Sequence, residues 1–232
     1  MTGHIARFYQ PHVAKGMHTL DAEHSRHAKA FRLEVGDDIG LFDGTHEYSC
    51  RFHSWKGKVA LVEVLKSELT PQTGAQITLA VSWPKGDRGD WLVEKTTELG
   101  AFAIIPLITK HTIVVPNPKK IARLQQLAIG ACEQSGRGTI PTISEPQTLH
   151  NILKNKTNYD AFVVGDSQGT SHIPSAKRIL ILIGPEGGFS PEEITAIKQA
   201  NAIPMRAASN TLRTETAAIA LLTLTASHIS PN

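Results

Sequence analysis

The chain has 232 residues, of which 41% are hydrophobic and 19% are charged, the composition of an ordinary globular protein. It is long enough for one large domain or two small ones, and no run approaches the ~20 apolar residues that a membrane-spanning helix needs. The N-terminal sequence MTGHIARFYQPH lacks the apolar core of a signal peptide. We therefore expect a cytoplasmic protein without a membrane partner.

The charge pattern permits a nucleic-acid partner but does not require one. The formal net charge is +3, and residues 1–70 carry nine Lys/Arg against nine Asp/Glu, so any basic surface has to be local. Cys50 and Cys132 lie far apart and in no metal-ligand spacing, so we expect two reduced, buried thiols. His24 and His27 have the spacing of two ligands on a helix, but no third ligand lies nearby, and we expect surface histidines and no metal site.

Residues 1–70 predict a small, largely β module. Apolar and polar residues alternate over residues 37–55 on both sides of Asp43-Gly44, a turn signal, and this pattern predicts a hairpin. A further alternating strand is expected over residues 59–65, and residues 21–35 are typical of a short helix.

Residues 71–74 are the predicted linker, after which the pattern changes to units of strand, loop and helix. The expected strands are 75–83, 103–108, 159–166, 178–185 and a weak one at 202–209, and the expected helices are 89–101, 117–136, 190–201 and 214–229. The second helix has a clear start, because Asn117 is a good N-cap and Pro118 fits the first helical position. The alternation indicates an α/β fold with a mostly parallel sheet and helices on both faces.

The segment LILIGPEGGFSPEE, residues 180–193, joins an apolar strand to a helix. Ser190 as N-cap, with Glu193 three residues later, predicts a capping box. The loop Gly184–Gly188 then follows the carboxyl end of a central strand, where open α/β sheets bind ligands. Because Glu186 lies in this loop and no P-loop lysine is present, the loop disfavours phosphate and suits a neutral or cationic ligand such as a sulfonium cofactor. The alternative is a glycine-rich turn needed only for its geometry.

The segment SNTLRTETAAIALL, residues 209–222, contains a second loop before a helix. Arg213 precedes this helix and Glu215 lies in its first turn. Arg213 either forms a surface ion pair with Glu215 or directs its charge toward a ligand cleft beside the first loop. The second role requires that the two strand–loop–helix junctions lie near each other.

Four segments resemble a known family: PKGDRGDWLVEKTTELG, ACEQSGRGTIP, IGPEGGFSPEE and LRTETAA. In order and spacing they look like the signature segments of bacterial 16S rRNA uridine-1498 N3-methyltransferases, the RsmE type of the SPOUT superfamily, and the resemblance spans nearly the whole chain. It implies a PUA-like β-barrel domain for RNA binding over residues 1–70 and a SPOUT methyltransferase domain with a deep trefoil knot over residues 75–232. It also implies a homodimer, S-adenosylmethionine as cofactor, and 16S rRNA of the small ribosomal subunit as substrate.

The resemblance also implies site residues. By position in these segments, the expected cofactor-binding residues are Val164, Gly165, Ile183, Gly184, Pro185, Glu186, Gly187, Gly188, Leu212, Arg213, Thr214, Thr216 and Ala217. Methylation at N3 of uridine requires that N3 lose its proton, and Arg213, by position and charge, is our candidate for stabilising the uracil anion, with Glu215 orienting it. RNA contacts are expected at Arg7, Arg26, Arg32, Lys85, Arg88 and Arg137, of which the last three face either RNA or a dimer partner.

The chain departs from the family pattern in two places. Residues 207–211, AASNT, stand where family members commonly have Leu-Gly, and TKHTIVV at 109–115 replaces a more usual Glu-Arg-Ser pattern, so Lys110 and His111 inherit no role. Two other functions stay open: a SPOUT methyltransferase acting on another nucleotide or on tRNA, and a non-catalytic RNA-binding or ribosome-assembly protein that kept the fold. The intact GPEGG and LRTETA segments argue against the second of these.

Overall fold

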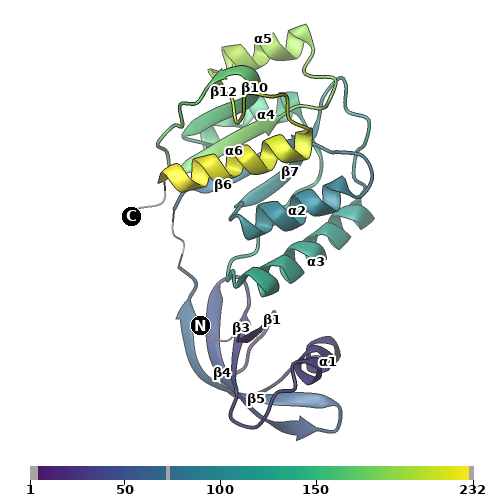
Figure 1. The fold of residues 1–232 in the computed structure, drawn as a ribbon, viewed down its shortest axis with the longest axis vertical. Helices are drawn as coiled ribbons and strands as arrows, with labels where there is room; N and C mark the ends of the chain where they lie inside the picture. The colour runs from purple at the N-terminus through teal and green to yellow at the C-terminus, as the bar shows by residue number, and fades with distance from the viewer. Residues whose placement is uncertain (1–4, 72–73, 230–232) are drawn as a thin grey trace. The chain divides into compact units, whose positions relative to one another are not determined.

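A computed structural model describes residues 5–71 and 74–229 (Figure 1). The chain forms two compact units. The first lies within residues 1–72 and takes in residues 132–140, and the second lies within residues 73–131 and 141–232. Part of the predicted linker, residues 72 and 73, lies outside the described residues.

The first unit is largely β, as its sequence predicts. Its elements are β1 Ala6–Tyr9, β2 Gly16–Thr19, α1 Ala22–Ala30, β3 Asp38–Phe42, β4 His46–Lys56 and β5 Val59–Leu69. They form a sheet in the order β1-β3-β4-β5-β2, in which β1 and β3 run parallel and the other neighbours antiparallel. The predicted hairpin is confirmed by β3 and β4. Phe8, Leu20, Ile39, Leu41 and Phe52 form much of the apolar core.

Residues 132–140, at the end of α3 and in the loop after it, group with the first unit. The contact is polar: Glu133 Oε1 accepts a hydrogen bond from the backbone N–H of Tyr9 at 2.8 Å and lies 2.9 Å from Nε2 of His24. His24 also pairs through Nδ1 with Asp21 at 2.7 Å. A division of the chain by composition alone does not foresee this segment, because its partners lie more than a hundred residues away.

The second unit alternates strands and helices. Its elements are β6 Gln76–Ser82, α2 Arg88–Glu98, β7 Ala103–Ile108, α3 Pro118–Ser135, β8 Thr142–Ile143, β9 Gln147–Thr148, α4 Leu149–Lys154, β10 Ala161–Thr170, β11 Arg178–Ile183, α5 Pro191–Gln199, β12 Ile203–Met205 and α6 Thr214–Ile229. The sheet order is β12-β10-β11-β6-β7-β8, with β9 beside β7. Every pair formed by the described strands of this sheet is parallel, which confirms the predicted mostly parallel sheet.

Helices cover both faces of this sheet (Figure 1). The strand β11 alternates its side chains between them: Ile179, Ile181 and Ile183 pack with residues of α2, α3 and α6, whereas Leu180 and Leu182 pack with residues of α4 and α5. A strand buried on both sides has an apolar side chain at every position, which accounts for its uninterrupted apolar run.

Some short elements differ from the expectation. The weak strand expected at 202–209 spans only Ile203–Met205, and β8, β9 and α4 were not predicted. Strands of two residues leave no alternating pattern in a sequence, so periodicity does not reveal them. Among the described helices, none has the length and apolar character that crossing a membrane requires.

Candidate ligand pocket beside β10, β11 and β12

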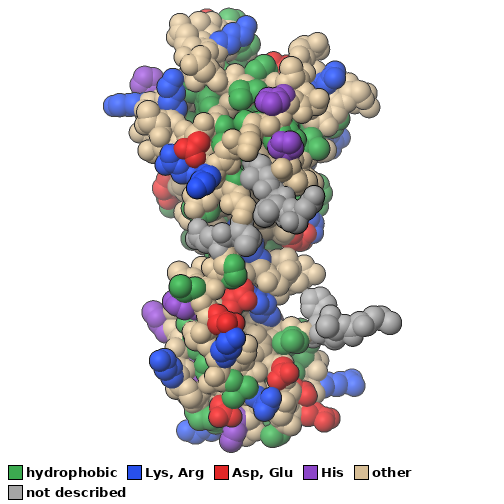
Figure 2. All heavy atoms as spheres, turned by 90° about the vertical axis from the view of Figure 1, so that its left-hand side faces the viewer, with side chains coloured by type: hydrophobic (Ala, Val, Ile, Leu, Met, Phe, Trp, Pro, Cys, Tyr) green, Lys and Arg blue, Asp and Glu red, His purple; other side chains and the backbone are tan. Residues whose placement is uncertain are grey.

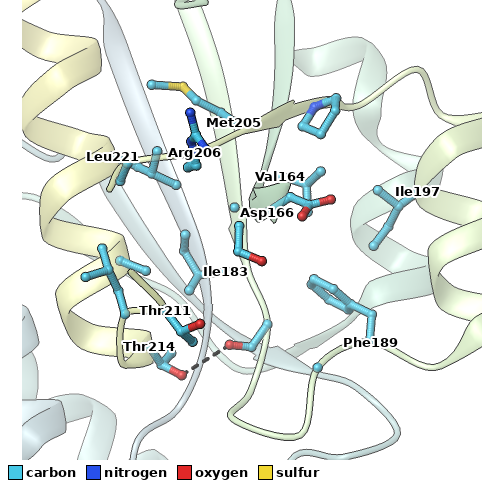
Figure 3. A pocket seen from close by; sticks show the side chains of 18 of the residues that line it. Val164, Asp166, Ile183, Phe189, Ile197, Met205, Arg206, Thr211, Thr214 and Leu221 are labelled. Atoms are coloured by element: carbon cyan, nitrogen blue, oxygen red, sulfur yellow. Dashed lines mark hydrogen bonds between the residues drawn. The ribbon is translucent and has the colours of Figure 1, made fainter. Parts of the chain in front are cut away.

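A pocket of about 610 Å³ opens beside the carboxyl ends of β11 and β12 and the middle of β10, residues 164–167 (Figure 3). Small-molecule sites commonly have volumes of ~300–1,000 Å³, and open parallel sheets bind their ligands at the carboxyl ends of the strands. The pocket therefore has both the size and the position of a ligand site.

The pocket has apolar walls and a few polar groups. Its labelled apolar side chains in Figure 3 are Val164, Ile183, Phe189, Ile197, Met205 and Leu221. Its labelled polar side chains are Asp166, Arg206, Thr211 and Thr214. A largely apolar cavity with a small number of polar groups is typical of a site for an organic ligand.

The local structure requires glycine at two positions of the loop after β11. Gly188 has φ +71°, a left-handed conformation that disfavours side chains, and its N–H donates to the carbonyl of Pro185 at 2.9 Å to close a turn. A Cβ atom at Gly184 would lie 2.9 Å from the ring of Phe189. The loop is therefore compact, and a residue with a side chain would not fit at either of these two positions.

The capping box predicted for α5 is confirmed. The N–H of Glu193 donates to Oγ of Ser190, and Oε2 of Glu193 accepts from the N–H of Ser190 at 2.8 Å. The other oxygen, Oε1, accepts from the backbone N–H of Lys110 at 2.8 Å, and Nδ1 of His111 donates to the carbonyl of Gly188 at 3.0 Å. The turn after β7 thus supports the glycine loop through residues to which the family resemblance assigned no role.

The helix α6 holds the same loop from another side. Oγ1 of Thr214, the first residue of α6, donates to the carbonyl of Gly184 at 3.2 Å (Figure 3). The two strand–loop–helix junctions that the sequence singled out, 184–190 and 209–214, therefore lie side by side. A ligand cleft shared by the two junctions requires this proximity, so the requirement stated in the sequence analysis is met.

The charged residues at the start of α6 are arranged differently from the expectation. Glu215 is only 4% exposed and pairs with Arg88 at 3.4 Å, not with Arg213. Arg213 is exposed, and its guanidinium makes no hydrogen bond or ion pair with any residue that the structure describes. Glu215 was expected to orient Arg213, but its carboxylate pairs instead with Arg88, which lies 127 positions from Glu215 in the sequence.

Most of the expected cofactor-binding residues line the pocket. Those that do are Val164, Gly165, Ile183, Gly184, Pro185, Glu186, Gly188, Leu212, Thr214 and Ala217. Gly187, Arg213 and Thr216 are not among the lining residues. Sequence reasoning missed Asp166, Phe189, Arg206, Asn210 and Thr211. Asp166 ends the strand expected at 159–166, and the other four residues follow β11 and β12 along the chain. These positions were the available signal, since loops that follow parallel strands meet at one edge of a sheet.

In the first unit, the expected RNA contacts differ in accessibility. The side chain of Arg7 is 17% exposed, pairs with Glu47 at 3.0 Å and lies 4.9 Å from the centre of the Phe42 ring. Arg26 and Arg32 are exposed. On the face of the first unit that Figure 2 shows, basic and acidic side chains are interspersed, which agrees with its balanced charge.

The remaining expected RNA contacts, Arg137, Lys85 and Arg88, differ in burial and in their partners. Arg137 is partly buried, which lowers the pKa of its guanidinium, and its Nε donates to Oγ1 of Thr139 at 3.0 Å. Lys85 is exposed, and the half-buried Arg88 is engaged with carboxylates. No group of three or more His, Cys, Asp or Glu side chains in the described ranges is arranged to hold a metal ion.

Comparisons with known proteins agree on one family. A family model described as an RNA methyltransferase domain matches residues 71–226. The ribosomal RNA small subunit methyltransferase E of Rickettsia conorii is 34% identical over 86% of this chain and 85% of its own length.

Two solved structures are similar over nearly their full length. One is a ribosomal RNA small subunit methyltransferase E from Neisseria gonorrhoeae bound to S-adenosyl methionine, with a TM-score of 0.84 and 30% identity over 94% of this chain and 95% of that one. The other, a methyltransferase from Legionella pneumophila in complex with its cofactor SAM, has a TM-score of 0.83 and 30% identity over 97% and 98% of the two chains. This chain therefore belongs to the RNA methyltransferase domain family, among the ribosomal RNA small subunit methyltransferase E proteins.

Proposed function

We propose that this protein transfers a methyl group from S-adenosylmethionine to N3 of uridine 1498 in the 16S rRNA of the small ribosomal subunit. The observation that carries the proposal is the pocket beside the carboxyl ends of β11 and β12, lined by residues of the GPEGG and LRTETA segments. Membership of the family and the S-adenosylmethionine-bound relatives support the same function.

The chemistry of the pocket fits this cofactor. Apolar walls suit an adenine ring, and Asp166 and Arg206 offer a carboxylate and a guanidinium for hydroxyl and amino-acid groups. Glu186 lines the pocket, so the loop favours a cationic sulfonium over a phosphate. The loop Gly184–Gly188, with Leu212 and Thr214, would hold the molecule through backbone and hydroxyl groups. When bound, S-adenosylmethionine supplies an electrophilic methyl group.

The chain must then make the uracil reactive. N3 lies on the Watson–Crick edge and carries a proton, so the base has to be unpaired and its N3 deprotonated before transfer. Arg213 supplies a positive charge just before α6 that is unpaired among the described residues, and the amino-terminal end of α6 adds partial positive charge. In this proposal Arg213 stabilises the uracil anion, and the enzyme's main contribution is to align N3 with the methyl group.

The same proposal includes the wider organisation expected from the resemblance. Separate cores support the two domains, 1–70 and 75–232, with residues 132–140 grouping with the first. The five-stranded sheet and α1 of the first unit are compatible with a PUA-like RNA-binding barrel. For the second domain, the proposal includes the deep trefoil knot that the family resemblance implies. A homodimer in the cytoplasm, where ribosomal subunits are assembled, completes the proposal.

Methylation of ribosomal particles tests the function directly. Small subunits from cells that lack this modification are incubated with the protein and labelled cofactor, and the rRNA is then reverse-transcribed. N3-methyluridine blocks base pairing, so we expect one new stop next to uridine 1498. A stop elsewhere, or label in tRNA, would identify another SPOUT-type methyltransferase. Calorimetric cofactor binding without transfer to any RNA would favour a non-catalytic RNA-binding protein.

A further inference from the structure

We infer that Arg88 is a positioning residue for the cofactor loop: its guanidinium holds Glu186 of the loop next to Glu215 of α6. The inference rests on the proposed function, because it assigns to this ion-pair cluster a role in binding S-adenosylmethionine. It also gives a role to Glu186, the carboxylate that is unexpected in a glycine-rich ligand loop.

The three side chains come from three elements of the second unit. Nη1 of Arg88, the first residue of α2, lies 3.6 Å from Oε1 of Glu186 and 3.4 Å from Oε1 of Glu215. Nε of Arg88 donates to the carbonyl of Lys85 at 3.3 Å, and this third contact also restrains the guanidinium. One cation therefore bridges the pocket-lining loop and the amino-terminal turn of α6.

The burial of Glu215 makes this bridge necessary. Its side chain is only 6% exposed, and Oε2 has no hydrogen-bond partner among the described residues. A buried carboxylate without a counter-charge is strongly destabilising, so Arg88 offsets the cost of burying Glu215 in the first turn of α6. Glu215 holds the guanidinium of Arg88 in place, and the half-exposed carboxylate of Glu186 pairs with that guanidinium.

The surroundings of Arg88 also argue against a phosphate contact. One guanidinium between two carboxylates gives the cluster a net charge of about −1 at neutral pH, and an approaching phosphate would meet repulsion as well as attraction. The same excess negative charge does not oppose a sulfonium ligand. Arg88 is therefore better suited to positioning the loop than to the RNA contact expected from the sequence.

The loop has two further supports that do not involve Arg88. Thr214 holds the carbonyl of Gly184, and His111 holds the carbonyl of Gly188. Between them, the side chain of Glu186 is the part of the turn that reaches toward α2. Loss of Arg88 should therefore leave the two ends of the turn in place and release its middle.

The test is a double-mutant cycle read by the dissociation constant of S-adenosylmethionine, measured by calorimetry on the full chain. Arg88→Gln and Glu186→Gln should each weaken binding by about 3-fold, since each removes the part-exposed ion pair between Arg88 and Glu186. The double variant should bind no more weakly than Glu186→Gln alone, because Arg88 acts on the cofactor only through Glu186. Arg123→Gln, which removes another arginine that pairs with α2 through Asp90, is the matched control and should bind the cofactor like the wild type.

Stability separates positioning from support of the fold. Arg88→Gln should lower the thermal unfolding temperature, because Glu215 is left buried without a counter-charge. Adding Glu215→Gln should restore that temperature while cofactor binding stays weak, and Arg88→Lys should retain part of the affinity. Recovery of affinity together with stability would mean that Arg88 only neutralises Glu215, and would overturn the inference.

RNA binding supplies the remaining distinction. The slope of log K for RNA against log salt should be the same for Arg88→Gln and the wild type, whereas a lost phosphate contact would reduce it by about one. A reduced slope with unchanged cofactor affinity would overturn the inference, as would additive losses in the cycle. If the wild type binds no cofactor, the proposed function fails together with the inference. Equal cofactor binding by the wild type and Arg88→Gln would overturn the inference alone.

Discussion

At the scale of single residues, the two arginines near the pocket differ in what surrounds them. Arg88 is engaged with Glu186 and Glu215, whereas the guanidinium of Arg213, beside the start of α6, pairs with none of the residues that the structure describes. We predict that Arg213→Ala lowers turnover by about 100-fold, the usual cost of removing a group that stabilises transition-state charge. Cofactor affinity should change little, because Arg213 does not line the pocket.

The measurement is single-turnover methylation of undermethylated subunits, alongside calorimetric cofactor binding. Arg213→Lys is the control and should retain a larger share of the turnover, since it keeps a positive charge near the same place. Equal losses of turnover and of cofactor affinity in Arg213→Ala would contradict the role given to this residue.

Arg32 is the second residue whose surroundings lead to a prediction. It follows α1 and has φ 55°, a left-handed conformation that costs a side-chain-bearing residue about 1 kcal/mol relative to glycine. Arg32→Gly should therefore raise the free energy of unfolding by about 1 kcal/mol, measured by urea denaturation. If Arg32 contacts a phosphate, as its sequence position suggests, RNA affinity should fall and its salt slope should drop by about one.

Asn201 provides the control for this change. It lies two residues after the end of α5 with φ 60°, and asparagine tolerates this conformation better than arginine. Asn201→Gly should accordingly raise stability less and leave RNA binding unaltered. A more stable Arg32→Gly variant that binds RNA as tightly as the wild type would remove Arg32 from the RNA-binding surface.

Local sequence signals predicted contacts between residues that are close to each other in the sequence. Ser190 and Glu193 are three positions apart, and their capping box forms as expected. The pairing of Arg88 with Glu215 is different, because it spans 127 positions and depends on how α2 and α6 pack on the sheet. A single sequence contains no distance between such residues, so the second pairing needed the structure.

At the scale of elements, the β3–β4 turn is stabilised by one carboxylate. Burial alone would raise the pKa of Asp43, but hydrogen bonds from Tyr48, Thr45 and His46 outweigh it and lower the pKa from 3.8 to about 2. A lowered pKa in the folded state stabilises the protein above the unfolded pKa, and this stabilisation is lost as the pH falls through about 2.

We predict that Asp43→Asn lowers the free energy of unfolding at pH 7 by about 1 kcal/mol, a modest value because solvent reaches part of the turn. The difference between the variant and the wild type should shrink as the pH is lowered from 4 toward 2. Urea denaturation at several pH values measures both effects. A difference that stays constant over this range would show that the charge of Asp43 does not contribute.

At the scale of the whole molecule, the strand–helix alternation of residues 75–232 predicted the parallel sheet and the edge at which the pocket lies. The apolar run of β11 was informative because a strand buried on both faces has no polar positions. The sequence did not reveal that residues 132–140 complete the first unit. That contact depends on Glu133 meeting Tyr9 and His24, and no local pattern marks such a long-range polar contact.

This long-range contact leads to a prediction about pH. Burial of the His24 ring opposes its charge, but hydrogen bonds to Glu133 and Asp21 outweigh burial and raise its pKa above the usual 6.5. A raised pKa in the folded state stabilises the protein fully below the unfolded pKa, and the stabilisation is lost as the pH rises through the folded value. The contact between residues 132–140 and the rest of the first unit should therefore weaken between pH 6 and pH 9, when the ring loses its charge.

Hydrogen exchange at the Tyr9 amide, which donates to Glu133, reports this contact directly. We expect the free energy of opening at that amide to fall by about 0.5–1 kcal/mol from pH 6 to pH 9, after allowance for solvent screening and for the intrinsic pH dependence of exchange. In His24→Gln, which keeps a hydrogen-bond donor but has no titrating charge, the fall should be absent. The amide of Leu79 in the core of the second unit is the internal control, because no part of this cluster contacts it. A fall of equal size in the wild type and in His24→Gln would mean that another group couples the segment to pH.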